Sequence, residues 1–258
     1  MKRRTILCEG PVDIVALRAI AKFMVPGAER WRLVDRDRAL RAGESKKVMI
    51  EQRGALELSI TAVDGKSRLV PMLMELLKDL AEQEDHVAIV FDPDLDPPSV
   101  QHAACDTALK ALAPSWSITE SSAPGHVALW KLATDTGLAV IIHSIPWFSS
   151  GRTLDDLDQN VQHLERILCE VLARSKPEML LVVERWLVEM KQVPGAKPCW
   201  KSAMHLWCAL VDPKQSTASF AERVLGQDDA FRDFAMAVLG ETALLDDLRP
   251  LLEVSEPV

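Results

Sequence analysis

HVAIVFDPDLD, at residues 86–96, is the stretch that best indicates the fold of this chain. Residues 86–91 form a nearly uninterrupted apolar run, which is the pattern of a strand buried on both faces. Three aspartates follow at alternate positions where the strand ends, at Asp92, Asp94 and Asp96. Strands buried on both faces are typical of a parallel sheet that is covered by helices on each side.

The first half of the chain alternates strand-like and helix-like patterns. Strands are predicted at residues 5–8, 56–63, 86–91 and 137–145, and helices at 11–25, 67–80 and 99–112. This alternation predicts an α/β fold with a mainly parallel sheet that helices flank. From residue 154 to 252 the pattern is almost entirely helical. We therefore expect an α/β core at residues 1–150 and a mostly helical part at 151–258, which completes or caps that core.

The charge of the chain is acidic overall but unevenly distributed. The formal net charge is −8, which argues against a broad, non-specific nucleic-acid binder. Residues 29–53 nevertheless hold eight Lys or Arg against five acids, and residues 212–258 hold four against ten. The basic segment is either a solvated face or a surface that contacts phosphate groups. Its candidate phosphate-binding residues are Arg36, Arg38, Lys46 and Lys47.

The cysteines and the apolar segments of the sequence indicate the cellular compartment of the protein. The five cysteines are scattered and form no C-x-x-C pair, which favours reduced thiols over disulfides or a zinc site. The apolar stretch near the N-terminus is interrupted by Glu9 and Asp13, so it does not fit an export signal. No apolar run has the length that spans a bilayer. We expect a cytoplasmic protein without a membrane partner, and the sequence is compatible with a homo-oligomer.

A second acidic position follows the first predicted strand. Glu9 comes directly after that strand, Gly10 turns the chain, and Pro11 suits the first turn of a helix. Residues at the carboxyl end of a parallel strand face the crevice in which α/β proteins bind ligands. Asp13 either reaches the same crevice as a metal ligand or favours the N-terminus of the helix electrostatically.

The two acidic positions together predict a metal site. Neighbouring carboxylates repel one another, so either a cation lies among them or some are protonated. Mg²⁺ prefers oxygen ligands and usually binds through one or two carboxylates, water and phosphate. A calcium-binding EF-hand loop does not fit, because Pro97 and Ala103 stand where that loop has Gly and Glu. We expect Mg²⁺ between Glu9 and residues 92–96, with Mn²⁺ as the alternative cation.

A third acidic stretch follows the strand predicted at residues 137–145. Thr153 suits the N-cap of a long helix, and Asp155 and Asp156 suit its first turn. Helix capping is one interpretation of these acids, and a second metal position is the other.

Two lysines are further candidates. Lys201 and His205 are four residues apart and share a helix face, so Lys201 is either a surface lysine or a group that stabilises phosphate charge. Residues 64–67, Asp-Gly-Lys-Ser, are similar to the end of a P-loop, but Ile60 stands where its first Gly is required. An ATPase is therefore not indicated, and Lys66 remains a candidate phosphate contact.

The order of these motifs resembles the TOPRIM domain, which topoisomerases, bacterial primases, recombination proteins and nucleases of the OLD (overcoming lysogenisation defect) family share. The resemblance rests on Glu9-Gly10 after a first strand and on the alternate aspartates after a later one. It is closest to small stand-alone TOPRIM proteins related to OLD nucleases and spans about residues 5–211. Their glycine-lysine turn, Leu-Glu-Asp helix start and late Lys-Ala helix are similar to Gly65-Lys66, Leu154-Asp155-Asp156 and Lys201–Ala209.

The resemblance implies a TOPRIM-like, Rossmann-like fold and a Mg²⁺-dependent nuclease that hydrolyses phosphodiester bonds in DNA or RNA. It implies that Glu9, Asp92 and Asp94 bind the metal, that Asp96 assists, and that Glu9 acts as general acid or base. Lys201 would neutralise charge at the phosphorus. It also suggests a role in phage defence with a separately encoded ATPase partner. A topoisomerase that forms a phosphotyrosine link is excluded, because the chain has no Tyr.

Two other function classes stay open. One is a non-catalytic TOPRIM module that binds a partner protein, for which Trp200 and Trp207 on one helix face could supply a surface. The other is a phosphatase of the haloacid dehalogenase type, which also uses Asp-x-Asp after a strand. In that class the motif normally comes near the start of the chain, and Thr or Val usually stands where this chain has Asp96.

Overall fold

The computed structural model describes residues 2–24, 32–36, 47–53, 56–78, 80, 84–123, 126–149, 151 and 154–253. Its strands are β1 (Lys2–Cys8), β2 (Arg32–Arg36), β3 (Lys47–Arg53), β4 (Leu56–Ala62), β5 (Glu84–Phe91), β6 (Ser117–Ser122), β7 (Ala128–Ala133) and β8 (Ala139–Pro146). Its α-helices are α1 (Pro11–Phe23), α2 (Leu69–Lys78), α3 (Pro98–Lys110), α4 (Leu164–Ser175), α5 (Pro177–Lys191), α6 (Trp200–Val211), α7 (Thr217–Glu222), α8 (Asp229–Glu241) and α9 (Leu244–Leu252). Two short helical turns, η2 (Lys66–Arg68) and η3 (Arg223–Gln227), precede α2 and α8.

The strands form one mixed sheet with the order β2-β3-β4-β1-β5-β8-β7-β6. Its four central strands, from β4 to β8, run parallel, as the buried apolar runs predict. The predicted α/β class is therefore confirmed. Antiparallel pairs extend the sheet at both edges through β2 and β3 on one side and β6 and β7 on the other. The predicted strands did not include these four edge strands.

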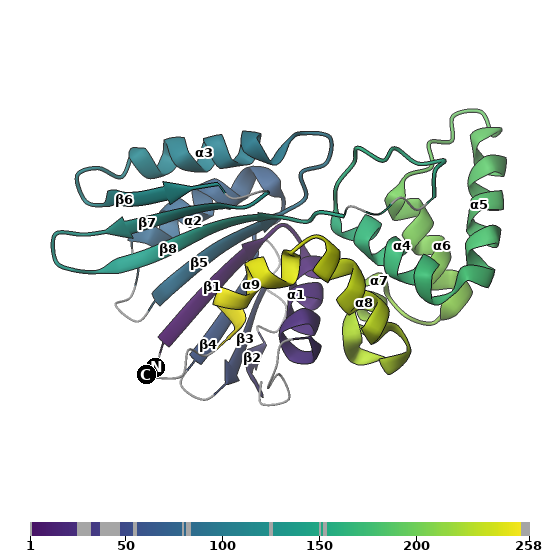
Figure 1. Ribbon diagram of the computed structural model, residues 1–258, viewed down its shortest axis with the longest axis horizontal. Coiled ribbons are helices and arrows are strands. Elements are labelled where there is room, and N and C mark those ends of the chain that lie inside the picture. The colour runs from purple at the N-terminus through teal and green to yellow at the C-terminus, as the bar shows by residue number, and fades with distance from the viewer. Residues whose placement is uncertain are drawn as a thin grey trace.

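Helices cover both faces of the sheet, because side chains along each strand alternate between the two faces. Ile6 in β1 and Val90 in β5 lie in one core cluster with α1 and the C-terminal helices, whereas Leu7 and Phe91 lie in the other with α2 and α3. Figure 1 shows α2 and α3 over one face, α1 and α9 over the other, and α4, α5 and α6 beyond the end of the central strands.

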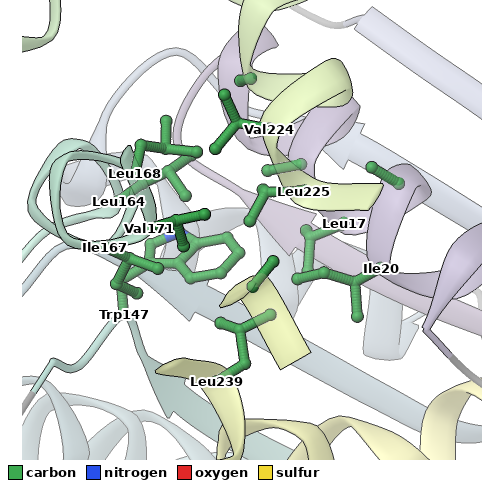
Figure 2. Packing of buried hydrophobic residues seen from close by; sticks show 14 of the residues in the cluster. Leu17, Ile20, Trp147, Leu164, Ile167, Leu168, Val171, Val224, Leu225 and Leu239 are labelled. Atoms are coloured by element: carbon green, nitrogen blue, oxygen red, sulfur yellow. The ribbon is translucent and has the colours of Figure 1, made fainter. Parts of the chain in front are cut away.

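The helical C-terminal part packs directly against the sheet. Its buried residues belong to the same core cluster as β1, β4 and α1. Trp147, which follows β8 and is fully buried, lies at the centre of this contact. Figure 2 shows its indole ring among Leu17 of α1, Ile167 of α4 and Leu239 of α8. The two predicted parts, residues 1–150 and 151–258, thus share one apolar core.

The long helix does not begin near Thr153, a residue outside the described part of the chain. Residues 154–163 form an irregular loop in which Leu154 has a φ of +56°, and α4 begins only at Leu164. The loop is stabilised by Arg166, whose guanidinium donates to the backbone carbonyls of Gly151, Gln159 and Val161. The predicted start of the helix near Thr153 is therefore wrong, because α4 begins at Leu164.

None of the helices in the described ranges combines the length and the apolar composition that crossing a membrane requires.

Candidate metal centre

The central strands end together, and this brings Glu9 and Asp92 to one edge of the sheet. Cys8, the last residue of β1, is paired with Ala62 of β4 and Val90 of β5. Glu9 and Asp92 each follow the end of their strand, and the backbone N–H of Asp92 donates to Oε1 of Glu9 at 2.7 Å. The predicted meeting of the two acidic positions is therefore what the structure shows.

Lys66 connects this pair to the turn after β4. Gly65, with a φ of +109° that favours glycine, donates its N–H to the carbonyl of Glu9 at 3.0 Å. The Lys66 ammonium donates to the carbonyls of Asp92 and Pro93 and to Oδ2 of Asp94, at 3.0, 3.2 and 3.0 Å. An ammonium group has three donors, so Lys66 is fully used in holding the acidic loop. A direct phosphate contact by Lys66 is therefore not what this arrangement favours.

The aspartates of the loop contact the segment that leads into α4. Oδ1 of Asp92 accepts from the N–H of Leu164, the first residue of α4, at 2.9 Å. Asp94, with a φ of +58°, forms an isolated antiparallel bridge with Gln162 through two backbone hydrogen bonds of 3.0 and 2.9 Å. The N-terminus of a 12-residue helix therefore points at the Asp92 carboxylate, which its dipole stabilises.

Glu165, in the first turn of α4, is a site residue that sequence reasoning missed. Its side chain is 14% exposed, and its Oε2 lies 3.2 Å from Nδ1 of the buried His163. On the other side, Oε1 lies 3.9 Å from the Lys201 ammonium. Leu164-Glu165 is a Leu-Glu pair at a helix start, ten residues after Leu154-Asp155, although Arg166 stands where the Leu-Glu-Asp start has its Asp.

The pKa values of Glu9 and Asp92 are raised by burial and by the charges of neighbouring carboxylates. Burial raises the pKa of Glu9 to about 7, and the charges of Asp13 and Asp94 add to this effect. Burial also raises the pKa of Asp92 well above its usual range, with added repulsion from Asp13 and Glu165. Crowded carboxylates of this kind favour either protonation or a bound cation.

Glu165 and Lys201, near the centre, have pKa shifts that favour their charged forms. The pKa of Glu165 is lowered, because its contact with His163 and the charge of Lys201 together outweigh the burial that would raise it. The charges of Glu165 and then Asp92 raise the pKa of Lys201. Lys201, predicted as a catalytic residue, is thus a protonated group that faces the acidic centre, while its side chain remains 65% exposed.

Asp13 acts as a helix cap and a buried hydrogen-bond acceptor. Its Oδ2 accepts from the N–H of Gly10, the N-cap residue of α1, at 2.8 Å, and its Oδ1 accepts from the Trp147 indole at 2.8 Å. The Gly10 contact is the half of a capping box that the N3 carboxylate supplies. Burial raises the pKa of Asp13 to about 6. Of its two predicted roles, the structure shows the cap. Both oxygens have protein donors and the side chain is buried, which favours this structural role over metal binding.

Three predicted metal ligands lie away from the centre. Asp155 is exposed and lines a separate hollow with Glu170 and Glu184, and Asp156 forms an ion pair with Lys191 of α5 at 2.6 Å. Both belong to the loop that replaces the expected helix start, and their surroundings do not support their prediction as ligands. Asp96 is exposed in the turn where its N–H donates to Pro93, and the geometry gives no support to its assisting role.

The predicted basic residues fall partly on the same edge of the sheet. The register pairs Lys47 of β3 with Ala62 of β4, and Ala62 is paired with Cys8. The backbone of Lys47 is therefore about 10 Å, two strand spacings, from that of Cys8. Arg36 ends the neighbouring strand β2 at this edge. Arg38 and Lys46 lie outside the described residues.

The donor set fits a hard divalent cation. Glu9, Asp92, Glu165 and Asp94 supply only carboxylate oxygens, the ligands that Mg²⁺ and Mn²⁺ prefer. Glu9 and Asp92 each use one oxygen in a backbone hydrogen bond, which orients the side chain. In the described part of the chain, however, no three such side chains stand together as a ready-made ligand group. Water therefore has to complete the coordination, as it usually does for Mg²⁺.

Comparison with known proteins gives a fold but no family. No protein family model matches the chain, and no curated protein matches it. The crystal structure of a hypothetical protein from Pyrococcus horikoshii OT3 is similar with a TM-score of 0.67 and 18% sequence identity, over 98% of this chain and 100% of that one. At this identity the match supports the fold alone, an α/β mixed sheet with flanking helices and a helical C-terminal part.

Two further matches are much weaker. A glyoxylase/bleomycin resistance protein/dioxygenase domain from Frankia sp. EAN1pec has a TM-score of 0.20 at 10% identity, over 56% of this chain and 90% of that one. A glyoxalase family protein from Enterococcus faecalis has a TM-score of 0.19 at 13% identity, over 55% and 95% of the two chains. Scores this low carry no argument about fold or function.

Proposed function

We propose that this protein is a TOPRIM-like, Mg²⁺-dependent nuclease that hydrolyses phosphodiester bonds in DNA or RNA. The observation that carries the proposal is that Glu9 and Asp92 lie together where β1 and β5 end. The charge of Glu165 in α4 acts on Asp92, and the Lys201 ammonium lies 3.9 Å from Glu165. Carboxylates gathered beside a lysine suit a substrate that is itself anionic, because a bound cation bridges the two sets of negative charge.

Each side chain has a role that follows from its surroundings. Glu9 accepts the N–H of Asp92 through Oε1, so its other carboxylate oxygen can accept a proton from the attacking water, as a general base does. Asp92 is oriented by the N-terminus of α4, and Glu165 lies between His163 and Lys201. Lys201 is positioned to stabilise negative charge that develops on the phosphate oxygens. Bound Mg²⁺ would add Lewis-acid stabilisation of the same charge.

Plasmid-nicking and RNA-degradation assays with Mg²⁺ or Mn²⁺ test the activity. Wild type is compared with Glu9→Gln and Asp92→Asn, which remove the carboxylate charge at nearly constant size. We expect both variants to lose at least about 100-fold in rate, since each removes a group of the reacting centre. Asp155→Asn is the matched control, because it removes an exposed acid of the same chain, and it should cleave like wild type.

A parallel binding measurement separates metal binding from hydrolysis. Mg²⁺ at ten times its dissociation constant should stabilise the wild-type protein by about 1.4 kcal/mol in thermal unfolding, and should stabilise Glu9→Gln less. Cleavage that persists unchanged in both Glu9→Gln and Asp92→Asn would show that the acidic centre does not carry the activity. Stabilisation by Mg²⁺ without cleavage of any nucleic acid would support the non-catalytic TOPRIM module instead. Hydrolysis of p-nitrophenyl phosphate alone would support the phosphatase.

A further inference from the structure

A groove opens between α5 and α6. It has a volume of about 470 Å³ and is lined by Trp186, Met190, Lys197, Ser202, His205 and Leu206, among others. Ser202 is the residue after Lys201, whose ammonium lies 3.9 Å from Glu165. The groove and the Glu165–Lys201 contact therefore both involve residues of the first turn of α6.

The charge of this groove differs from that of the rest of the molecule. The residues that line it include Lys197 and His205 and no acid, in a chain whose net charge is −8. Lys197 and His205 are exposed on the wall of the groove. The separate hollow that includes Asp155, Glu170 and Glu184 has three acids and one arginine, Arg174, among its lining residues. An anionic ligand is therefore attracted to the α5–α6 groove and repelled from that second hollow.

The floor of the groove is suited to a flat apolar group. Trp186 is half-buried and lies with Met190 and Leu206, so part of its indole is accessible from the groove. Proteins that bind single-stranded nucleic acids combine cationic walls, which follow the phosphates, with aromatic side chains on which bases stack. A base in a duplex is already stacked and paired, so a single aromatic residue on a groove floor selects unpaired strands.

We propose that the α5–α6 groove binds a single-stranded segment of nucleic acid, with a base against Trp186 and the phosphates along Lys197 and His205. This rests on the proposed nuclease function, because the groove then holds the strand whose phosphodiester lies at the centre. Lys201 stands at the junction and contacts the phosphate nearest the acids. The protein is accordingly a nuclease for single-stranded or unpaired regions.

Fluorescence anisotropy with a labelled oligothymidylate, in EDTA so that no hydrolysis occurs, tests the groove. Lys197→Ala should weaken binding about three- to tenfold and lower the slope of log K against log salt by about 1, as expected for one lost phosphate contact. Trp186→Leu keeps an apolar side chain on the floor and should weaken binding about fivefold or more through lost stacking. Lys110→Ala, an exposed lysine of α3, is the matched control and should bind like wild type.

Two further measurements complete the test. A duplex of the same length should bind more weakly than the single strand and should be insensitive to Trp186→Leu. Circular dichroism and thermal unfolding must show that the variants are folded, since Trp186 packs partly against the core. If Lys197→Ala and Trp186→Leu both bind the oligonucleotide as wild type does, the proposed single-strand binding in the groove is wrong. It is also wrong if Trp186→Leu dissociates a dimer and leaves oligonucleotide binding unchanged.

The two proposals can fail separately. If wild type cleaves nucleic acid but the groove variants bind and cleave as wild type does, the groove is wrong and the nuclease stands. If the groove variants lose oligothymidylate binding but wild type cleaves nothing in Mg²⁺ or Mn²⁺, the nuclease is wrong. In that case the groove binds a single strand but is not the substrate site of a nuclease.

Discussion

Two carboxylates of the candidate centre are fixed before any ligand arrives. Glu9 is oriented by the Asp92 backbone and Asp92 by the first N–H of α4, and Glu165 lies 3.2 Å from Nδ1 of His163. Side chains held in this way lose little conformational entropy on binding a cation, which favours affinity. The mutual repulsion of the charges is the cost of this arrangement, and it appears as the raised pKa values of Glu9 and Asp92.

Glu165 is the residue whose role is most open to a direct test. Replacement by Gln keeps the size of the side chain and removes its charge next to Asp92 and Lys201. We expect Glu165→Gln to reduce Mg²⁺ affinity at least about tenfold in isothermal titration calorimetry. The pKa of Lys201 should also fall, because the neighbouring carboxylate that raises it is absent.

Asp155→Asn serves as the comparison for this measurement, since Asp155 is an exposed acid that sequence reasoning placed at the metal. Its Mg²⁺ affinity should equal that of wild type. The assignment of Glu165 would be contradicted if Glu165→Gln also kept wild-type affinity, and the exclusion of Asp155 if Asp155→Asn lost it.

At the scale of elements, Asp13 joins α1 to the end of β8. It caps the helix through Gly10 and accepts the indole N–H of Trp147, which lies at the centre of the core in Figure 2. Asp13→Ala removes a cap worth about 0.5–2 kcal/mol and leaves a buried indole donor without its partner, at a cost of about 1–3 kcal/mol. We expect a loss of about 2–4 kcal/mol in the free energy of unfolding, measured by urea denaturation.

Asp13→Asn is the conservative variant for this contact. It keeps one oxygen acceptor and removes the charge that burial disfavours, so it should cost clearly less than Asp13→Ala. Equal losses in the two variants would mean that Asp13 stabilises the fold by its charge and not by its hydrogen bonds.

At the scale of the whole molecule, the two ends of the described chain contact each other. Leu248, Leu251 and Leu252 of α9 are fully buried in the main core, and the buried Arg4 of β1 donates to the carbonyl of Glu253 at 2.5 Å. Figure 1 shows α9 lying across the face of the sheet beside α1. The stability of the fold therefore responds to the ionisation of groups on α9.

Asp247 of α9 makes this response measurable. Burial, with the charge of Asp246 as a second cause, raises the pKa of Asp247 to about 6. Between about pH 4 and pH 6 the folded chain thus holds a proton that the unfolded chain releases, so stability falls as pH rises through this window. Asp247→Asn removes the effect and should be more stable than wild type at pH 8. The gain should stay below about 2 kcal/mol, because solvent screens a half-buried carboxyl.

Urea denaturation at pH 4 and pH 8 provides the measurement. The advantage of Asp247→Asn over wild type should be larger at pH 8 than at pH 4, where the wild-type carboxyl is largely protonated in the folded state. An advantage that is independent of pH would point to packing or helix propensity and would contradict the ionisation argument.

The sequence by itself determined the centre of the sheet and two of its acidic positions. Val87–Phe91 and Ile6–Cys8 are apolar on both faces, and this local pattern directly reflects burial between two layers of helices. Because parallel strands end at a common edge, acids placed directly after such strands had to lie near one another. Glu9 and Asp92 were therefore predictable without knowledge of any contact.

Only the tertiary structure decided which other groups join them. Asp155 and Glu165 both stand near Leu residues early in a helical region, and no local pattern distinguishes the exposed acid from the one at the centre. The choice follows from where α4 begins, which depends on contacts between Asp94 and Gln162 and between Asp92 and Leu164. Such contacts join residues about 70 positions apart, and local periodicity records only burial and turns, not which distant side chains meet.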